Sequence, residues 1–563
     1  MYLPEETLKQ LLVDDKIITP DVFEQAVVHA RETDSTIEQA LREQDIIPDG
    51  QLGEIVARYY KLPFVTINKL TIPEDVLNII PEDTARQFKV IAYERIDTAV
   101  KLAVSDPTNL LVPKLVSQKT GLNVELAYAT DWDIENSLTN YSTNFQDVFE
   151  KLLNEESKVV TTIVNDPPVK KMVEVIVEAA YKEKASDIHI EPQESDFIVR
   201  FRIDGLLRDI VVLPKRVHER VVTRIKILSN LRTDQHFAAQ DGKFKVNFPE
   251  HRLDLRVSIL PVADGEKVVM RLLSSQAKAF SLTDLGFSDA DLQKLRDASK
   301  RSFGMILVTG PTGSGKTTTI YSVLKTINTR EHNLTSIEDP IEYQIKGANQ
   351  VQVNEKTNLT FANGLRSLLR QDPDYIFVGE IRDGETAAIA INAALTGHLV
   401  FSTLHTNSAA ASLPRLFDMK VEPFLVASTV NLIIAQRLVR RICPHCRVSE
   451  TVTAEDLEKY FTKETIAQHY IPVGVKKEIR LYKGAGCRVC HGSGYLGRIG
   501  IYEVLSMSKA IRELTSSQAD ADTIYAKALE EGMISMFDDG VTKIARGMTT
   551  IEELLRVTTT QSE

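Results

Sequence analysis

Residues 305–320 read MILVTGPTGSGKTTTI, in which an apolar run leads into a glycine-rich loop and then into a segment suited to a helix. The loop from Gly310 to Thr317 fits the pattern G-x-x-x-x-G-K-[ST] in full. Glycines let the backbone turn tightly, so that successive N–H groups point at phosphate oxygens, and the start of a helix adds positive potential. The sequence therefore predicts an ATP-hydrolysing P-loop domain.

Within this loop, Lys316 is expected to reach the terminal phosphates, and the Thr317 hydroxyl is expected to ligate Mg²⁺. A glycine-rich turn that binds nothing is the alternative, and the Lys-Thr pair and both flanks argue against it. The residues expected to bind the nucleotide are Gly310, Pro311, Thr312, Gly313, Ser314, Gly315, Lys316, Thr317 and Thr318.

Two acidic groups follow further apolar runs. Tyr375–Val378 reads as a buried strand and leads to Glu380, at a place where most P-loop enzymes have a metal-holding aspartate. Leu334–Ile337 reads as another strand and leads to Glu338, which would lie near the γ-phosphate if this strand neighbours the strand that enters the P-loop. Turnover needs such carboxylates, so both are candidate catalytic residues; solvated strand ends are the alternative.

Two histidines bracket one more apolar run, Leu399 to Phe401. His398 precedes it and His405 follows it. A neutral imidazole can hydrogen-bond a phosphate oxygen or a water, so either could sense the γ-phosphate. An ordinary polar role is the alternative for both.

The cysteines fall in two C-x-x-C pairs: Cys443 with Cys446, and Cys487 with Cys490. Each pair presents two thiolates at the separation that a tetrahedral Zn²⁺ requires, which predicts a structural zinc site. The gap between the pairs is longer than in common zinc ribbons, so an inserted helical segment is expected there. His445 and His491 are not expected to coordinate. Free buried cysteines or two redox pairs are the alternatives.

The 563 residues, 43% hydrophobic and 26% charged, predict a multidomain globular protein. The net charge of -11 disfavours nucleic acid as a partner. Four cysteines suit a reducing compartment, and neither a secretory signal nor a membrane span is expected, so the predicted location is the cytoplasm. The apolar run from Phe424 to Ala435 is predicted to be a buried helix.

These motifs together resemble the secretion ATPases of type II secretion and type IV pilus systems, over about residues 170–510. The motifs that carry the resemblance are 310–317, 336–342 (SIEDPIE), 369–374 (LRQDPD), 379–383 (GEIRD) and 396–407. The resemblance implies an α/β fold with a RecA-like motor, assembled as a ring hexamer that binds ATP between one subunit's motor and another's preceding domain. The cysteine clip and the long N-terminal region are typical of extension or secretion motors rather than retraction motors.

The resemblance also assigns roles. Glu338 would orient the attacking water and Glu380 would be the Walker B carboxylate, although the two labels are interchangeable. Arg208 and Arg224 are nominated to reach the phosphates of a neighbouring subunit, with Arg200 and Arg202 as competitors. The loop at 236–242 (HFAAQDG) departs from the family's usual R-x-P-Q-D-G, which weakens the resemblance there.

The predicted domains are a helical module (1–62), a small α+β domain (63–143), a linker (144–168), a mixed α/β domain before the motor (169–278), the RecA-like core (279–440), a tetracysteine subdomain (441–505) and a C-terminal helical segment (506–563). Parts of the first domain resemble modules of which some bind cyclic di-GMP. Lys16 stands where such a motif carries glycine, so that ligand is not expected. Docking to an inner-membrane platform protein is expected instead.

The predicted function is ATP-driven polymerisation and extrusion of pilin in type IV pilus assembly, at the inner face of the cytoplasmic membrane. Extracting an apolar helix of about 20 residues from a bilayer costs several kcal/mol, so an energy source is needed. A type II secretion ATPase is the alternative. A nucleic-acid translocase is less favoured, as is a nucleotide-bound scaffold with negligible hydrolysis.

Overall fold

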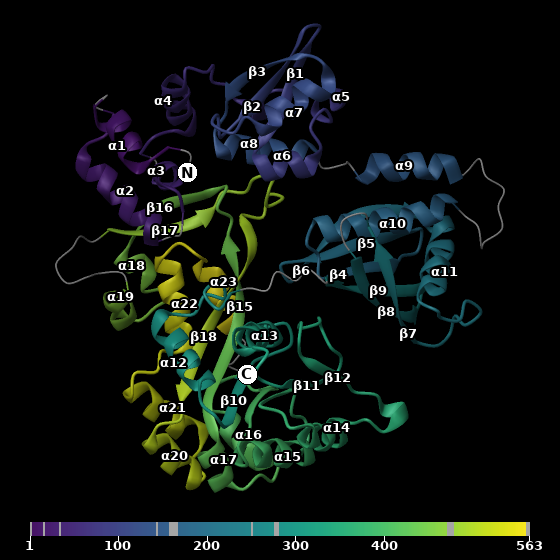
Figure 1. Ribbon diagram of the computed structural model, residues 1–563, viewed down its shortest axis with the longest axis vertical. Coiled ribbons are helices and arrows are strands. Elements are labelled where there is room, and N and C mark those ends of the chain that lie inside the picture. Colours follow the sequence, from purple (N-terminus) through teal and green to yellow (C-terminus); the bar gives the residue numbers. More distant parts are fainter. Residues whose placement is uncertain are drawn as a thin grey trace. The chain divides into compact units, whose positions relative to one another are not determined.

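The chain forms two compact units in the computed structural model, which describes residues 3–14, 17–32, 35–44, 46–141, 145–156, 167–248, 252–274, 281–469 and 478–558. The N-terminal unit comprises residues 1–143, 440–497 and 541–556. The motor unit comprises residues 144–439, 498–540 and 557–563. Figure 1 labels the elements of both.

The motor is built on a seven-stranded sheet with the order β12-β11-β13-β14-β10-β15-β18. The six strands from β12 to β15 pair in parallel. Several are buried along their whole length, because parallel strands are covered on both faces and therefore read as continuous apolar runs. The strands are β10 (Gly304–Thr309), β11 (Leu334–Glu338), β12 (Asn349–Gln352), β13 (Tyr375–Val378), β14 (Leu399–Leu404), β15 (Val430–Ile442) and β18 (Tyr495–Ser506).

Helices connect these strands. They are α12 (Asp289–Ser299), α13 (Lys316–Ile327), α14 (Phe361–Leu368), α15 (Gly384–Leu395), α16 (Ser412–Asp418) and α17 (Pro423–Thr429), followed later by α20 (Lys509–Ser516) and α21 (Ala521–Glu530). The α/β class and the alternation of strands and helices agree with the prediction from sequence.

The predicted helix from Phe424 to Ala435 is wrong in its second half. Helix α17 ends at Thr429, and β15 begins at Val430 and lies beside β10. Phe424 is 61% exposed rather than buried. A short apolar run does not reveal its own period, so the sequence alone could not separate a buried helix from a buried strand here.

Helix α15 packs through small side chains. Its residues Ala387, Ala390, Ala393 and Ala394 are all buried. At its first residue, Gly384, an added Cβ would lie 2.4 Å from the Met419 carbonyl oxygen. The backbone of this helix therefore approaches its neighbours more closely than larger residues would allow.

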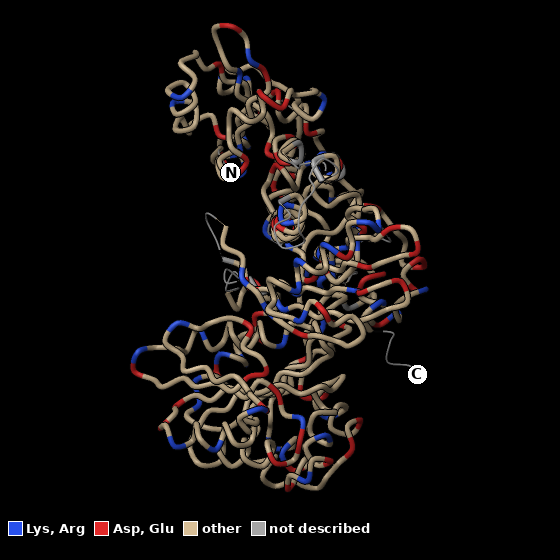
Figure 2. Tube along the Cα trace, turned by 90° about the vertical axis from the view of Figure 1, so that its right-hand side faces the viewer, with Lys and Arg blue, Asp and Glu red and all other residues tan. Residues whose placement is uncertain are grey.

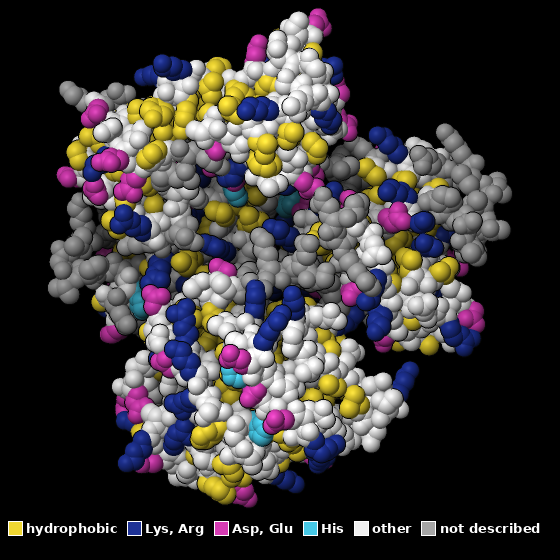
Figure 3. Space-filling view, viewed as in Figure 1, with side chains coloured by type: hydrophobic (Ala, Val, Ile, Leu, Met, Phe, Trp, Pro, Cys, Tyr) yellow, Lys and Arg dark blue, Asp and Glu magenta, His cyan; other side chains and the backbone are white. Residues whose placement is uncertain are grey.

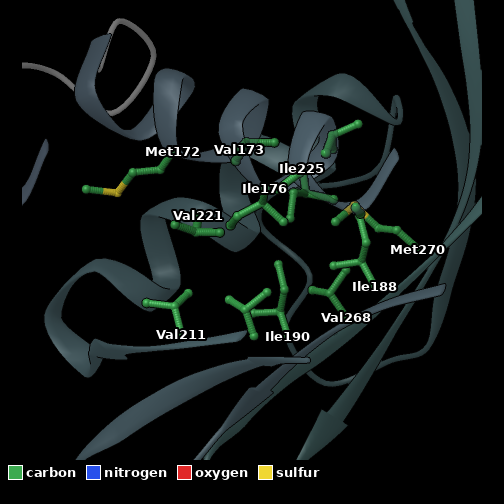
Figure 4. Packing of buried hydrophobic residues seen from close by; sticks show 14 of the residues in the cluster. Met172, Val173, Ile176, Ile188, Ile190, Val211, Val221, Ile225, Val268 and Met270 are labelled. Atoms are coloured by element: carbon green, nitrogen blue, oxygen red, sulfur yellow. The ribbon is translucent and has the colours of Figure 1, made fainter. Parts of the chain in front are cut away.

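The mixed domain before the motor has an antiparallel six-stranded sheet with the order β6-β5-β4-β9-β8-β7. Helices α10 (Pro167–Lys182) and α11 (His218–Leu228) contribute to its core, in which Met172, Ile176, Val221 and Ile225 face the strand residues Ile188, Ile190, Val268 and Met270 (Figure 4). The strands are β4 (Asp187–Pro192), β5 (Asp196–Ile203), β6 (Leu206–Pro214), β7 (Gln240–Asn247), β8 (Arg252–Val262) and β9 (Gly265–Ser274).

The stretch predicted as a linker contains a helix, α9 (Phe145–Glu156). Phe149 and Leu152 of this helix belong to the same hydrophobic core as α10 and α11. The apolar spacing of these two residues, three apart, is what places both on one face.

The N-terminal unit begins with four helices, α1 (Glu5–Asp14), α2 (Pro20–Glu32), α3 (Ile37–Glu43) and α4 (Asp49–Tyr60). A three-stranded sheet follows, in the order β1-β2-β3, built from β1 (Val90–Ile96), β2 (Ala99–Val104) and β3 (Asn123–Tyr128). Helices α5 (Glu74–Leu77), α6 (Glu82–Phe88), α7 (Leu111–Thr120) and α8 (Asp131–Ser137) complete this part.

The same unit contains the segment between the two cysteine pairs. The predicted helical insert is mainly an antiparallel pair, β16 (Arg447–Thr453) with β17 (Glu478–Gly484), and two short helices lie between these strands, α18 (Ala454–Leu457) and α19 (Lys463–His469). Figure 1 shows β16 and β17 beside the first helices of the chain.

Charged residues of both signs are interspersed along the motor unit (Figure 2), and the face in Figure 3 shows basic side chains beside acidic ones. Of the helices in the described ranges, none has the length and apolarity that crossing a membrane would require.

Candidate active site

The P-loop lies between β10 and α13, as the sequence predicts. Gly310, Gly313 and Gly315 have φ values of 145°, 79° and 88°, a region that L side chains rarely adopt. A Cβ on Gly310 would also lie 2.4 Å from the Gln436 carbonyl oxygen. Glycine is therefore required at the turn that aims the backbone N–H groups.

Lys316 is the first residue of α13, and its side chain is held over the loop. Its Nζ donates to the carbonyl oxygens of Gly310, at 2.7 Å, and Pro311, at 3.2 Å. Burial lowers the pKa of Lys316, and the negative charge of Glu380 opposes that shift. The ammonium group is thus positioned beside the loop that would hold the phosphates.

Gln436 of β15 braces the loop from the side, a contact that the sequence did not indicate. Its Nε2 donates to the Ser314 carbonyl oxygen at 2.6 Å, and its Oε1 accepts from the Thr319 hydroxyl at 2.7 Å. The residue is 1% exposed. An amide that follows the apolar run Leu432–Ala435 was the available signal, since buried polar groups are rarely left without partners.

Glu380 follows β13 and lies beside an arginine and a histidine. Its carboxylate contacts Arg382 Nη2 at 2.6 Å and His405 Nε2 at 3.3 Å. The Thr403 hydroxyl donates to the neighbouring Gly379 carbonyl at 2.7 Å, which ties this turn to β14. The fold therefore brings together Glu380, His405 and Lys316, three of the predicted site residues.

Glu338 is placed differently. It ends β11 in a buried position, where its carboxylate accepts hydrogen bonds from Ser336 Oγ at 2.5 Å, from Gln350 Nε2 at 3.1 Å and from the Tyr321 hydroxyl. Burial raises the pKa of Glu338, although these hydrogen bonds act in the opposite direction. The side chain thus links the P-loop helix α13 to β11 and β12.

The segment 336–342 (SIEDPIE), here called the acidic box, has a second and more exposed carboxylate in Glu342, which was not among the predicted site residues. Arg256 of β8, in the mixed domain, donates to the Ile341 carbonyl at 3.1 Å and has Nη1 3.9 Å from Glu342. Burial lowers the pKa of Arg256, and the negative charge of Glu342 acts in the opposite direction without reversing the shift. An arginine of the preceding domain thus contacts the acidic box of the same chain.

The remaining candidates lie apart from this cluster. The Nδ1 of His398 is 3.0 Å from the Ala393 carbonyl oxygen and donates to it at the end of α15. Arg208 lies on β6 and Arg224 on α11. Of their competitors, Arg200 pairs with Asp209 at 2.9 Å, and Arg202 donates to the Gly205 carbonyl at 3.0 Å.

The four cysteine sulfurs lie within 4.8 Å of one another. The Sγ–Sγ distances are 3.8 Å for Cys443–Cys487, 3.8 Å for Cys446–Cys490 and 3.6 Å for Cys487–Cys490. A tetrahedron with Zn–S bonds of about 2.3 Å has sulfurs about 3.8 Å apart, whereas a disulfide bond is about 2.05 Å long. The spacing is compatible with tetrahedral zinc, and none of these three distances is that of a disulfide bond.

Comparisons with known proteins agree with this geometry. A family model described as type II/IV secretion system protein matches residues 163–556, and an MshEN domain model matches residues 60–144. The type IV pilus assembly ATPase PilB of Myxococcus xanthus is 36% identical over 562 residues, which cover 97% of this chain and 98% of that protein. Type II secretion system protein E of Pseudomonas aeruginosa is 44% identical over 394 residues, 70% of this chain and 76% of that protein.

Among solved structures, the Legionella pneumophila ATPase DotB superposes with a TM-score of 0.51 at 21% identity, over 69% of this chain and 95% of that one, which supports the fold. The predicted family, fold class and enzyme class are confirmed. The chain belongs to the type II/IV secretion system ATPase family and is a P-loop ATPase.

Proposed function

We propose that this ATPase is the hexameric motor of type IV pilus assembly, coupling ATP hydrolysis to the polymerisation and extrusion of pilin. The observation that carries the proposal is the similarity to a type IV pilus assembly ATPase along nearly the whole chain, the N-terminal domains included. The motor contacts an inner-membrane platform protein and so works at the inner face of the cytoplasmic membrane.

Type II secretion is the second candidate. The specific observation in its favour is the 44% identity to a type II secretion protein E, although that match covers only 70% of this chain. A nucleic-acid translocase is disfavoured by the net charge of -11. Cyclic di-GMP is not expected to bind, and Lys16, on which this rests, lies outside the described residues.

In the proposed site, the P-loop amides and Lys316 hold the phosphates of ATP, and Thr317 ligates Mg²⁺. The metal supplies charge neutralisation on the phosphate oxygens. The contacts of the Glu380 carboxylate with Arg382 and His405 orient that carboxylate. This placement supports Glu380 as the group that acts on the metal or the attacking water. Glu338, which accepts a hydrogen bond from Tyr321 of α13, would be the second carboxylate of the site. One of the two would orient the attacking water and the other would be the Walker B carboxylate.

Two isosteric substitutions separate these roles. Glu380→Gln is expected to lower the rate of phosphate release by about 10²-fold or more while ATP still binds, because it removes a charge from the reacting site. Glu338→Gln is expected to lower both that rate and thermal stability, because the buried amide no longer accepts all three hydrogen bonds. Phosphate release, nucleotide affinity and melting temperature are measured on both variants. If both variants support pilus assembly at the parental level, the protein is a scaffold rather than a motor.

The ring arrangement is also a proposal. A hexamer would place ATP between the motor of one subunit and the mixed domain of the next, where Arg208 and Arg224 are the nominated trans arginines. Arg208 lies on β6 and Arg224 on α11. Each is tested by an Arg→Ala substitution in rings that also contain Glu380→Gln subunits.

We further propose that Cys443, Cys446, Cys487 and Cys490 hold a structural Zn²⁺. Four sulfur donors at tetrahedral spacing complete the coordination shell, so no position remains open for catalysis. His445 pairs instead with Glu135.

The biological assignment is tested by deletion of the gene in its host, with surface pili and secreted proteins scored separately. Loss of pili with secretion intact supports the proposal. Loss of secretion with pili intact would assign the chain to type II secretion.

A further inference from the structure

The first cysteine pair is covered by polar side chains from the N-terminal part of the same unit. Gln39 of α3 donates from Nε2 to the Pro444 carbonyl oxygen at 2.7 Å, and the Trp132 indole N–H of α8 donates to the His445 carbonyl oxygen. Pro444 and His445 are the two residues between the ligand cysteines. Two helices far apart in the chain therefore bind the backbone of one cysteine knuckle.

A buried charge pair adjoins these contacts. Glu43 of α3 and Arg447 of β16 are joined at 2.7 Å, with side-chain exposures of 0% and 5%. His29 of α2 lies 3.4 Å from the same carboxylate, and its ring stacks on Tyr482 of β17, with centroids 5.2 Å apart. Arg447 also donates to the Gly547 carbonyl at 3.1 Å, so a second contact, from the C-terminal part of the same unit, holds its side chain.

The buried pair of Glu43 and Arg447 restricts how α3 can lie against β16. Removing one partner of a buried ion pair leaves an uncompensated charge out of water, which is strongly unfavourable, whereas separating both partners lets each regain hydration. An apolar interface of the same size would lack this constraint. The buried pair therefore disfavours any other docking geometry that would part Glu43 from Arg447 and leave either charge buried.

We propose that the four-cysteine clip is the docking surface for the chain's own N-terminal region, residues 3–141, and that the metal keeps the knuckle in its docking conformation. The acceptors used by Gln39 and Trp132 are backbone carbonyls between two ligands, so their directions depend on where Cys443 and Cys446 are held. The docking rests on the contacts above; its dependence on metal rests on the proposed zinc site. Loss of the metal releases the N-terminal region.

Trp132 is the only tryptophan of the chain, so its fluorescence reports this contact directly. In the full-length protein, removing zinc with a chelator is expected to shift Trp132 emission to longer wavelength, as the indole loses its carbonyl partner and meets water. Hydrogen exchange of α3 should rise in parallel, and added zinc should reverse both changes.

The variant Glu43→Gln tests the docking without touching the clip. It removes the counter-charge of Arg447, and the same red shift is expected with the zinc content unchanged. Glu54→Gln, on exposed α4 surface, is the matched control and should leave emission as in the parent. Far-ultraviolet circular dichroism shows whether Glu43→Gln keeps its helices. If it does not, Gln39→Ala replaces it as the test, because it removes one donor without disturbing a buried charge, and a smaller red shift of Trp132 emission is expected.

These experiments test the docking contact and its dependence on metal separately. Unchanged emission and unchanged exchange of α3 in both Glu43→Gln and Gln39→Ala would overturn the docking. Complete removal of zinc with unchanged emission would overturn the metal dependence alone. If the purified protein carries no zinc, the zinc proposal fails, while the two variants still test the docking.

Discussion

Replacing Lys316 by alanine is expected to reduce phosphate release to about one-hundredth of the parental rate or less. Its ammonium group is fixed over the P-loop by the Gly310 and Pro311 carbonyls and would meet the charge that develops on the transferring phosphoryl group. Losing one preorganised charge-stabilising group typically costs about 10²–10³-fold in kcat. Because the lysine is also expected to contact the ground-state phosphates, nucleotide affinity should fall as well.

The measurement is phosphate release by purified, assembled protein, with nucleotide affinity determined separately. Lys325→Ala, an exposed lysine near the end of the same helix, is the matched control and should retain parental activity. Equal rates for Lys316→Ala and the parent would refute the assignment of this loop as the site of hydrolysis.

The second large effect is expected from Cys446→Ser. Binding of structural zinc to small domains is worth about 10–16 kcal/mol, so losing one thiolate should abolish metal retention and unfold the clip locally. Zinc content should fall from about one ion per chain to a trace. Hydrogen exchange should rise across β16 and β17, with a lower melting temperature for the N-terminal unit.

Metal analysis and hydrogen exchange on the same sample check this expectation. Ser449→Ala, on β16, alters a polar side chain in the hairpin without touching a sulfur and serves as the control. Zinc bound equally by Cys446→Ser and the parent would show that the metal is held elsewhere.

The motor was readable from sequence because its strands are buried on both faces. The predicted runs Met305–Thr309, Leu334–Ile337 and Tyr375–Val378 agree with β10, β11 and β13 to within one residue. The C-x-x-C spacing likewise encodes a local geometry, since two cysteines three apart are presented by a single turn. In both cases the signal lies within a few consecutive residues.

Features that depend on distant contacts could not be read in this way. Gln436 braces the P-loop only because β15 pairs with β10, an adjacency absent from the local pattern. Glu338 was expected near phosphate if its strand neighboured the loop strand, but β11 lies between β12 and β13 rather than beside β10, and its side chain contacts α13 and β12. The order of strands in a sheet is not encoded in local spacing. Arg256 was passed over because choosing among arginines requires the packing of the mixed domain against the acidic box.

The alanine-lined helix α15 bears on how the Glu380 turn can respond to substrate. Gly384, where the helix begins, lies four residues after Glu380, and the helix backbone there is in near contact with Met419. Four of its six buried side chains are alanine, which has no rotamers, so on this helix only Thr386 and Ile391 could rearrange to absorb a displacement. A shift of the helix should therefore be transmitted largely to the turn, and the position of the Glu380 backbone should follow the position of α15 in the motor.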